Sequence, residues 1–229
     1  MMQNQSILSE FLQYLAHYPA DTDSLPPLNV ISKEIGISVA SLREQLEVAK
    51  ALGFVEVRPR TGIRKIGFNY LPSVLLGLQY ALAEDAAKFN LFADLRQKIE
   101  SAYWFEAVEL LDENDKQDLL RLLNNAKRKL YGSPIQIPHE EHKHLHLTIY
   151  SKLNNPFVNG ILEAYWASYE LIGLNFFTDL DYLVTVWNYH EKMVVCIINN
   201  DFKQGYQAMR EHTDLLGSLL THKPNTSTL

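Results

Sequence analysis

The sequence predicts a mainly α protein in two domains: an N-terminal winged helix-turn-helix (α with a small β-hairpin wing) and a C-terminal all-α antiparallel helical bundle. Three observations predict this class. Residues 4–68 read as three helices and a hairpin, the chain beyond them reads as long helices without a convincing strand, and 47% of the 229 residues are hydrophobic. We expect the domains to span residues 1–70 and 71–229.

The N-terminal elements follow from apolar spacing and from turn residues. The expected bounds are 4–17, 28–34 and 38–52 for the helices, and 54–57 and 62–68 for the strands. Asn29 and Ser38 are expected to cap the second and third helices, while Gly36 and Gly53 are expected to end them. The order helix, helix, turn, helix, hairpin is typical of a winged helix-turn-helix, whose third helix lies in the DNA major groove.

The tip of the expected hairpin is basic. Residues 57–66 carry four cations and no acid: Arg58, Arg60, Arg64 and Lys65. The net charge of −6 argues mildly against nucleic acid, because DNA affinity comes largely from cations that displace counterions. A local basic loop can nevertheless serve this purpose on an acidic protein.

The C-terminal part consists of long amphipathic segments. Helices are expected at 73–88, 92–111, 114–130, 138–153, 157–175, 179–198 and 201–221. Three aspartates lie near expected helix starts: Asp112, Asp179 and Asp201. No repeat of 20–50 residues is present, so these helices are expected to form a bundle and not a solenoid.

Several classes are excluded by what the sequence lacks. No apolar run approaches the roughly 20 residues that cross a bilayer, and the first residues do not resemble a signal peptide. The single cysteine, Cys196, excludes an internal disulfide framework. We therefore expect a cytoplasmic protein with no membrane partner.

Four of the eight histidines are spaced to meet at one point. His142 and His146 are four residues apart and share a helix face. His190 and His212 lie at similar distances on either side of a turn at 199–201, so on antiparallel helices they stand level. Such a set can hold a divalent transition metal in a bundle core, although histidines that are merely packed remain the alternative.

The other histidines and the known enzyme motifs do not extend this site. His139, His144 and His222 are interpreted as packed or surface residues. The zinc-protease motif His-Glu-x-x-His fails because Lys143 stands where its second histidine belongs, and the Glu-x-x-His pattern of di-iron bundles occurs only once. A metalloenzyme with a degenerate helix-turn-helix as an interaction module stays open as the second hypothesis.

At these residues the chain resembles the GntR-type regulators of the FadR subfamily, with the helical effector-binding domain called FCD. The resemblance covers nearly the whole chain. It rests on LP at 25–26, IGIS at 35–38, LREQL at 42–46, RPRTG at 58–62, LRQKIE at 95–100, His146 with Asn155-Pro156, and His190 with His212. The 22-residue interval between the last two histidines is its most specific element.

The resemblance implies a metal site and a ligand beside it. Metal-binding members have an aspartate four residues before the first of three histidines, and His142 stands at that position. Four imidazoles make a softer and more positive ligand set than three imidazoles with an aspartate, and this favours zinc or nickel over manganese. The alternative is that His142 lies near the ion without contacting it. The family's ligand is a small carboxylate, which Arg96 could clamp bidentately; an ion pair with Glu100 is the alternative role of Arg96.

The resemblance also implies a homodimeric repressor that binds a double-stranded DNA operator, because two copies on a palindrome multiply specificity. The candidate DNA-contacting residues are Ser38, Ser41, Arg43, Arg60, Thr61 and Gly62. Asn29 and Val39 stand where the family usually has arginines, which should weaken affinity and its salt dependence. The alternative role of Arg43 is an ion pair with Glu47.

Overall fold

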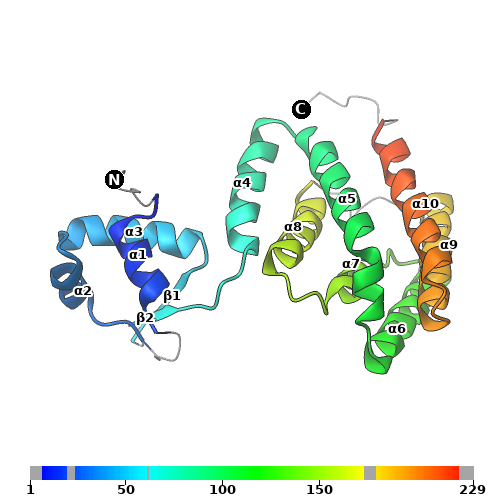
Figure 1. Ribbon diagram of the computed structural model, residues 1–229. Helices are drawn as coiled ribbons and strands as arrows, with labels where there is room; N and C mark the ends of the chain where they lie inside the picture. The colour runs from blue at the N-terminus through cyan, green and yellow to red at the C-terminus, as the bar shows by residue number, and fades with distance from the viewer. Residues whose placement is uncertain (1–6, 20–23, 61, 173–178, 222–229) are drawn as a thin grey trace, which may run out of the picture. The chain divides into compact units, whose positions relative to one another are not determined.

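The computed structural model describes residues 7–19, 24–60, 62–172 and 179–221 (Figure 1). The chain divides into two compact units, Met1–Gly77 and Leu78–Leu229. The class is mainly α, with a helix-turn-helix and a β-hairpin in the first unit and a helical bundle in the second. The predicted fold class is therefore confirmed.

The first unit contains the expected order of elements. They are α1 (Glu10–His17), α2 (Leu28–Ile35), α3 (Val39–Ala51), β1 (Val55–Arg58) and β2 (Gly62–Lys65). The strands pair antiparallel, with Val55 opposite Lys65 and Arg58 opposite Gly62. The amide of Leu25 donates to the carbonyl of Ile63 at 2.7 Å, which ties the segment before α2 to the wing.

The first unit has its own small core. Phe11, Ile31, Leu42 and Ala49 are fully buried where α1, α2 and α3 meet, and Val55 joins them from the hairpin. These residues follow the helical spacing in the sequence, which explains why the three helices pack as expected.

One expected cap is wrong. Asn29 lies inside α2, because the helix begins at Leu28 and Pro27 takes the N-cap position. The carbonyl of Pro27 accepts from the amides of Val30 and Ile31. Ser38, in contrast, caps α3 as expected, since its hydroxyl oxygen accepts from the amide of Ser41 at 3.1 Å.

Seven further helices follow in the described part of the chain, as expected. They are α4 (Leu71–Glu84), α5 (Lys88–Glu109), α6 (Glu113–Leu130), α7 (His139–Tyr150), α8 (Pro156–Leu171), α9 (Leu180–Ile198) and α10 (Phe202–Thr221). The break between α4 and α5 lies at 85–87, earlier than expected, because the Asp85 carboxylate accepts from the amide of Ala87 and closes a turn. No helix among the described residues is both long and apolar enough for a membrane span.

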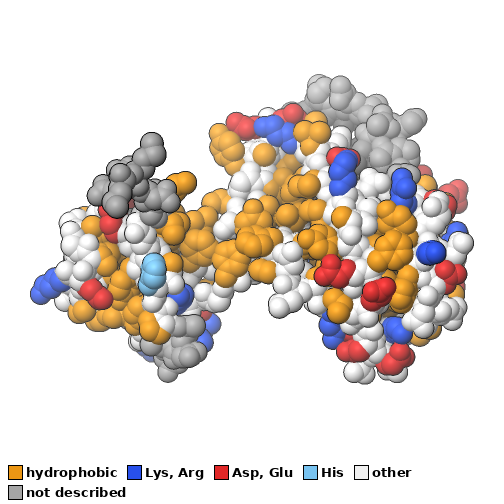
Figure 2. All heavy atoms as spheres, viewed as in Figure 1, with side chains coloured by type: hydrophobic (Ala, Val, Ile, Leu, Met, Phe, Trp, Pro, Cys, Tyr) orange, Lys and Arg blue, Asp and Glu red, His pale blue; other side chains and the backbone are white. Residues whose placement is uncertain are grey.

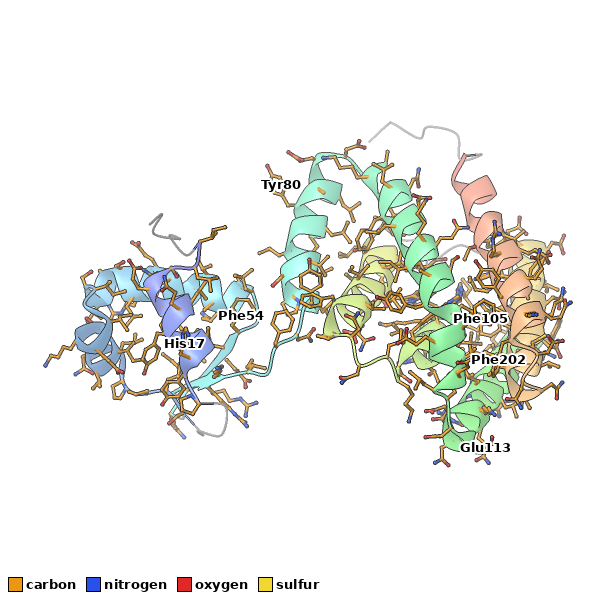
Figure 3. All side chains as sticks on the ribbon, in the orientation of Figure 1. His17, Phe54, Tyr80, Phe105, Glu113 and Phe202 are labelled. Atoms are coloured by element: carbon orange, nitrogen blue, oxygen red, sulfur yellow. The ribbon has the colours of Figure 1, made fainter. Side chains whose placement is uncertain are left out.

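The C-terminal bundle is organised around α5 and α9. Helix α9 packs against α10 and α6, and α5 packs against α7, α8 and α10. The buried indole of Trp104 on α5 donates to the carbonyl of Phe202 at the start of α10, at 2.9 Å. Figure 3 labels Phe202 and, on α5, Phe105, the residue after Trp104. The same core holds α7, which carries two of the four predicted ligands.

Candidate metal centre

The four predicted histidines converge inside the bundle. Helix α7 supplies His142 and His146, α9 supplies His190, and α10 supplies His212. The Nε2 atom of His146 lies 3.1 Å from that of His190 and 3.3 Å from that of His212. One ligand atom from each of the four residues lies within 4.8 Å of all the others. The structure thus brings together the whole predicted set.

Two local features place these rings. The interval of four residues on α7 puts His142 and His146 on one face, with ring centroids 5.2 Å apart. The turn between α9 and α10 is tight: Asn200 adopts a left-handed conformation (φ 56°), and the amide of Asp201 donates to the carbonyl of Cys196. The two helices leave this turn as a hairpin, which brings His190 level with His212.

The cluster is buried and holds its imidazoles neutral. His146, His190 and His212 are no more than 5% exposed, and His142 is partly buried. Burial, reinforced by the neighbouring imidazoles and Arg96, lowers the pKa of His142, His190 and His212 well below the ordinary value. Neutral imidazole is the form that binds a metal ion.

The spacing of the nitrogen atoms fits one metal ion. Nitrogens bound at 2.0–2.1 Å in a tetrahedron stand roughly 3.4 Å apart, and the two short Nε2 separations at His146 are close to this value. The Nε2 atom of His142 is buried with no hydrogen-bond partner among the described residues. Such an orphaned lone pair is costly in a protein interior unless an ion or a water uses it.

A charged pair lies directly behind the histidines. Arg96 and Glu100 on α5 are 4% and 0% exposed, and they form an ion pair of 3.0 Å. The Nδ1 atom of His146 lies 2.8 Å from Arg96 Nη2 and 3.2 Å from Glu100 Oε1. Burial would raise the pKa of Glu100, but the charge of Arg96 and the contact with His146 outweigh it and lower that pKa.

The second side of Arg96 faces aromatic rings. Its guanidinium carbon lies 4.4 Å from the ring centroid of Tyr165 and 5.2 Å from that of Trp166. Its Nε atom is buried without a partner among the described residues. The ion pair with Glu100, the alternative role of Arg96, is therefore present, and Arg96 also lies beside the histidine cluster.

Sequence reasoning missed three residues around this site. The sequence suggests Glu100 only as a partner of Arg96, whereas in the structure it also contacts His146. Two tryptophans line the cluster: the ring centroid of Trp166 lies 4.7 Å from His142, and that of Trp187 lies 4.7 Å from His190. Trp187 lies three residues before His190 on α9, a spacing that places both rings on one helix face and that could have pointed to it. No spacing signal points to Trp166, because it reaches the site from α8.

The remaining histidines lie apart from this set. His139 stacks on Tyr169 with centroids 5.5 Å apart and contacts Glu170. Lys143 contacts the same carboxylate oxygen of Glu170 at 3.0 Å. The ammonium of Lys143 thus supplies the positive charge beside Glu170 that a metal ion would otherwise supply. His144 is exposed, and His222 lies outside the described residues.

The candidate DNA-contacting residues fall on α3 and the wing. Arg43 is exposed on α3 and makes no ion pair among the described residues, because Glu47 pairs with Lys50 instead. Ser38 and Ser41 lie at the start of α3 and are linked by the capping bond. Arg60 and Gly62 are exposed at the tip of the hairpin, both with positive φ. Thr61 lies outside the described residues.

Two of the four wing cations have other partners. Arg58 pairs with Glu56 at 2.6 Å. The ammonium of Lys65 donates to the carbonyl of Tyr18 at 2.7 Å, so Lys65 joins the wing to the end of α1. Arg60 and Arg64 keep exposed side chains on this hairpin.

Comparisons with known proteins agree with this architecture. Solved structures similar to this chain include Streptococcus agalactiae GntR, with a TM-score of 0.64 and 15% identity over 91% of this chain and 95% of that one. They also include Lar, described as controlling the expression of the Listeria monocytogenes agr system, with a TM-score of 0.54 and 13% identity over 94% of this chain and 96% of that one. A third is E. coli McbR/YncC, with a TM-score of 0.50 and 18% identity over 94% of this chain and 98% of that one. At these identities the likeness concerns the fold. None of the curated proteins compared with the chain matches it.

A family assignment comes from the second domain. The family model for the FCD domain matches residues 92–215, more than half of the chain, and this segment contains all four clustered histidines. The family consists of transcription regulators, so the metalloenzyme hypothesis is set aside. The chain belongs to the GntR-type transcription regulators with an FCD domain, the FadR-like subfamily.

Proposed function

We propose that this regulator is a homodimeric repressor whose C-terminal domain binds a divalent transition metal on His142, His146, His190 and His212, and a small carboxylate beside it. The single observation that carries the proposal is the convergence of imidazoles from three helices, with Nε2 atoms 3.1–3.3 Å apart at His146. The carboxylate then shifts the protein between states of different operator affinity.

The identity of the metal follows from the donor set. Four neutral imidazoles suit zinc, nickel or copper better than manganese or magnesium, which prefer oxygen ligands. An aspartate at position 142 would add a hard oxygen donor and a negative charge; His142 adds neither. We therefore assign zinc or nickel to this site.

The charge balance of the site supports an anionic effector. Arg96 and Glu100 neutralise each other, and the histidines are neutral, so a bound divalent ion leaves an uncompensated charge of about +2 in a buried pocket. A carboxylate can reduce this charge by coordinating the ion and by accepting hydrogen bonds from Arg96. The Nε of Arg96, which has no partner among the described residues, is one donor available for this purpose.

The N-terminal domain supplies the operator contacts in this proposal. Arg43 is exposed, with no ion pair to any described residue, on the helix that winged helix-turn-helix proteins insert into the major groove. Arg60 on the wing, and Ser38 and Ser41 at the start of α3, are suited to phosphate contacts. Thr61 and Gly62, which follow Arg60 in the sequence, complete the proposed set. Asn29 and Val39 bring no charge, so we expect weaker affinity and a smaller salt dependence than arginines there would give.

Dimerisation is supported by apolar side chains that remain exposed on α5. They include Leu91 (73%), Leu95 (42%) and Phe105 (42%). Figure 2 shows hydrophobic side chains gathered over this helix. Two copies of a winged helix are also needed to read a palindromic operator with adequate specificity.

One experiment tests the regulator and its metal together. DNA from the region upstream of the chain's own gene is titrated with purified protein in a gel-shift assay, with zinc, with nickel and after chelation. We expect specific retardation that competitor DNA of unrelated sequence does not remove, and one metal ion per chain in the purified protein. Absence of specific retardation would contradict the operator proposal; absence of stoichiometric metal would favour histidines that are merely packed.

A further inference from the structure

Nδ1 of His146 has two neighbours, one of which can bond to it only when it carries a proton and the other only when it does not. His146 Nδ1 lies 2.8 Å from Arg96 Nη2 and 3.2 Å from Glu100 Oε1, and these two atoms are themselves 3.0 Å apart. A guanidinium can only donate a hydrogen bond, and an ionised carboxylate can only accept one. Nδ1 can therefore bond to Arg96 only without a proton, and to Glu100 only with one.

The choice at Nδ1 decides whether His146 can bind metal. A neutral imidazole has a single N–H. When Nδ1 accepts from Arg96, the proton is on Nε2, which then donates to His190 or His212 and has no lone pair for an ion. When Nδ1–H donates to Glu100, the Nε2 lone pair faces the other histidines.

We propose that Glu100 is the positioning residue of this metal centre: it accepts the Nδ1 proton of His146 and so directs the Nε2 lone pair toward the ion. Arg96 competes for the same nitrogen and loses this contact when the ion binds, which frees its Nη2 for the carboxylate effector. The inference rests on the proposed function, because it requires that the histidines hold a metal.

The surroundings of Glu100 fit this role. Its carboxylate is completely buried, so no water can replace it as the acceptor. Both of its oxygens are otherwise without a hydrogen-bond partner among the described residues, apart from the contacts with Arg96 and His146. Metal-bound histidines generally donate their second N–H to such a carboxylate, and removing it typically costs 10–100-fold in metal affinity.

The test compares Glu100→Gln with Glu141→Gln in the full-length protein, using zinc alone as the probe. Glu141 is a matched control, since it is also buried on the same bundle but pairs with Lys129. The amide that Glu100→Gln introduces can donate to Nδ1 of His146 and so favours the non-binding tautomer. We expect zinc affinity, measured by competition with a chromophoric chelator, to fall 10–100-fold for Glu100→Gln and less than threefold for Glu141→Gln.

A second measurement does not depend on a variant folding. In zinc-loaded wild-type protein with 15N-labelled histidine, two-bond 15N–1H correlations report which ring nitrogen of His146 carries the proton. We expect Nδ1–H. A proton on Nε2 of His146, or equal zinc affinity of the two variants, overturns the role of Glu100 while leaving the metal site intact. Wild-type protein that binds neither zinc nor nickel overturns the proposed function itself.

Discussion

The imidazole rings of His190 and His212 lie with their centroids 4.3 Å apart, one on α9 and the other on α10. The hairpin between these helices fixes the separation, because both rings project from the same level above the turn at Asn199 and Asn200. Neither ring has an Nδ1 partner among the described residues. An ion held between them would depend on both.

Replacing either histidine should therefore remove tightly bound metal. Replacing a residue that only hydrogen-bonds to a metal ligand typically lowers metal affinity 10–100-fold. We expect His190→Ala and His212→Ala each to lower zinc affinity by more than this, because each removes a direct ligand. Metal content after dialysis against a weak chelator, measured by plasma mass spectrometry, checks this. His144→Ala is the control: its ring is exposed and contacts Glu140 at 3.5 Å, away from the cluster. Full metal retention by both core variants would contradict a shared site.

The neutral histidines predict a stability that depends on pH. Burial lowers the pKa of His142, His190 and His212 in the folded protein, whereas in the unfolded chain these groups titrate near 6.5. Below that value only the unfolded chain takes up protons, so stability is complete above about pH 6.5 and is lost as the pH falls through it. Each such histidine contributes a slope of about 1.4 kcal/mol per pH unit.

Thermal unfolding of chelated protein between about pH 7.5 and about pH 5.5 measures this dependence, since the range brackets the ordinary histidine pKa. The midpoint temperature of unfolding should fall as the pH is lowered. In His190→Asn, which has one titrating group fewer, the midpoint temperature should fall less steeply with pH. A midpoint that is constant or rises toward the acidic end would mean that these rings carry protons in the folded protein.

The parts of the fold that the sequence predicts are those that depend on local periodicity. The helices of both units, the hairpin and the Asp112 cap follow from apolar spacing and from short-range hydrogen bonds. The histidine cluster belongs to the same group, because the interval of four on α7 and the symmetric placement about one turn require only helix geometry.

The parts that could not be predicted depend on contacts between distant segments. Glu100 meets His146 from a position 46 residues away, and Trp166 reaches His142 from a different helix. Lys65 looks like a free wing cation in the sequence but donates to the carbonyl of Tyr18. In each case tertiary packing decides which partner a polar group receives.

Arg43 provides a test of the operator contacts. We expect Arg43→Ala to weaken specific binding by roughly 1–3 kcal/mol if the side chain reads a base edge, or to reduce the salt slope by about one if it contacts a phosphate. Quantitative gel shifts at two or more salt concentrations distinguish these outcomes. Lys50→Ala is the control, because Lys50 lies at the far end of α3 and is paired with Glu47. Unchanged affinity and slope in Arg43→Ala would exclude Arg43 from the interface.

The junction between α3 and the wing predicts a glycine requirement at position 53. Gly53 has a positive φ of 74°, and a Cβ added there would lie 2.5 Å from Cγ of Pro72. We expect Gly53→Ala to lose at least about 1–2 kcal/mol from the left-handed backbone alone, with the clash adding to it. Gly67→Ala is the matched control, since a Cβ there meets no atom within 4 Å. Denaturant unfolding followed by circular dichroism compares the two variants. Equal stability would mean that the backbone at position 53 tolerates a side chain and that Pro72 of α4 moves away from it, so the close packing of Gly53 against Pro72 would have no role in stability.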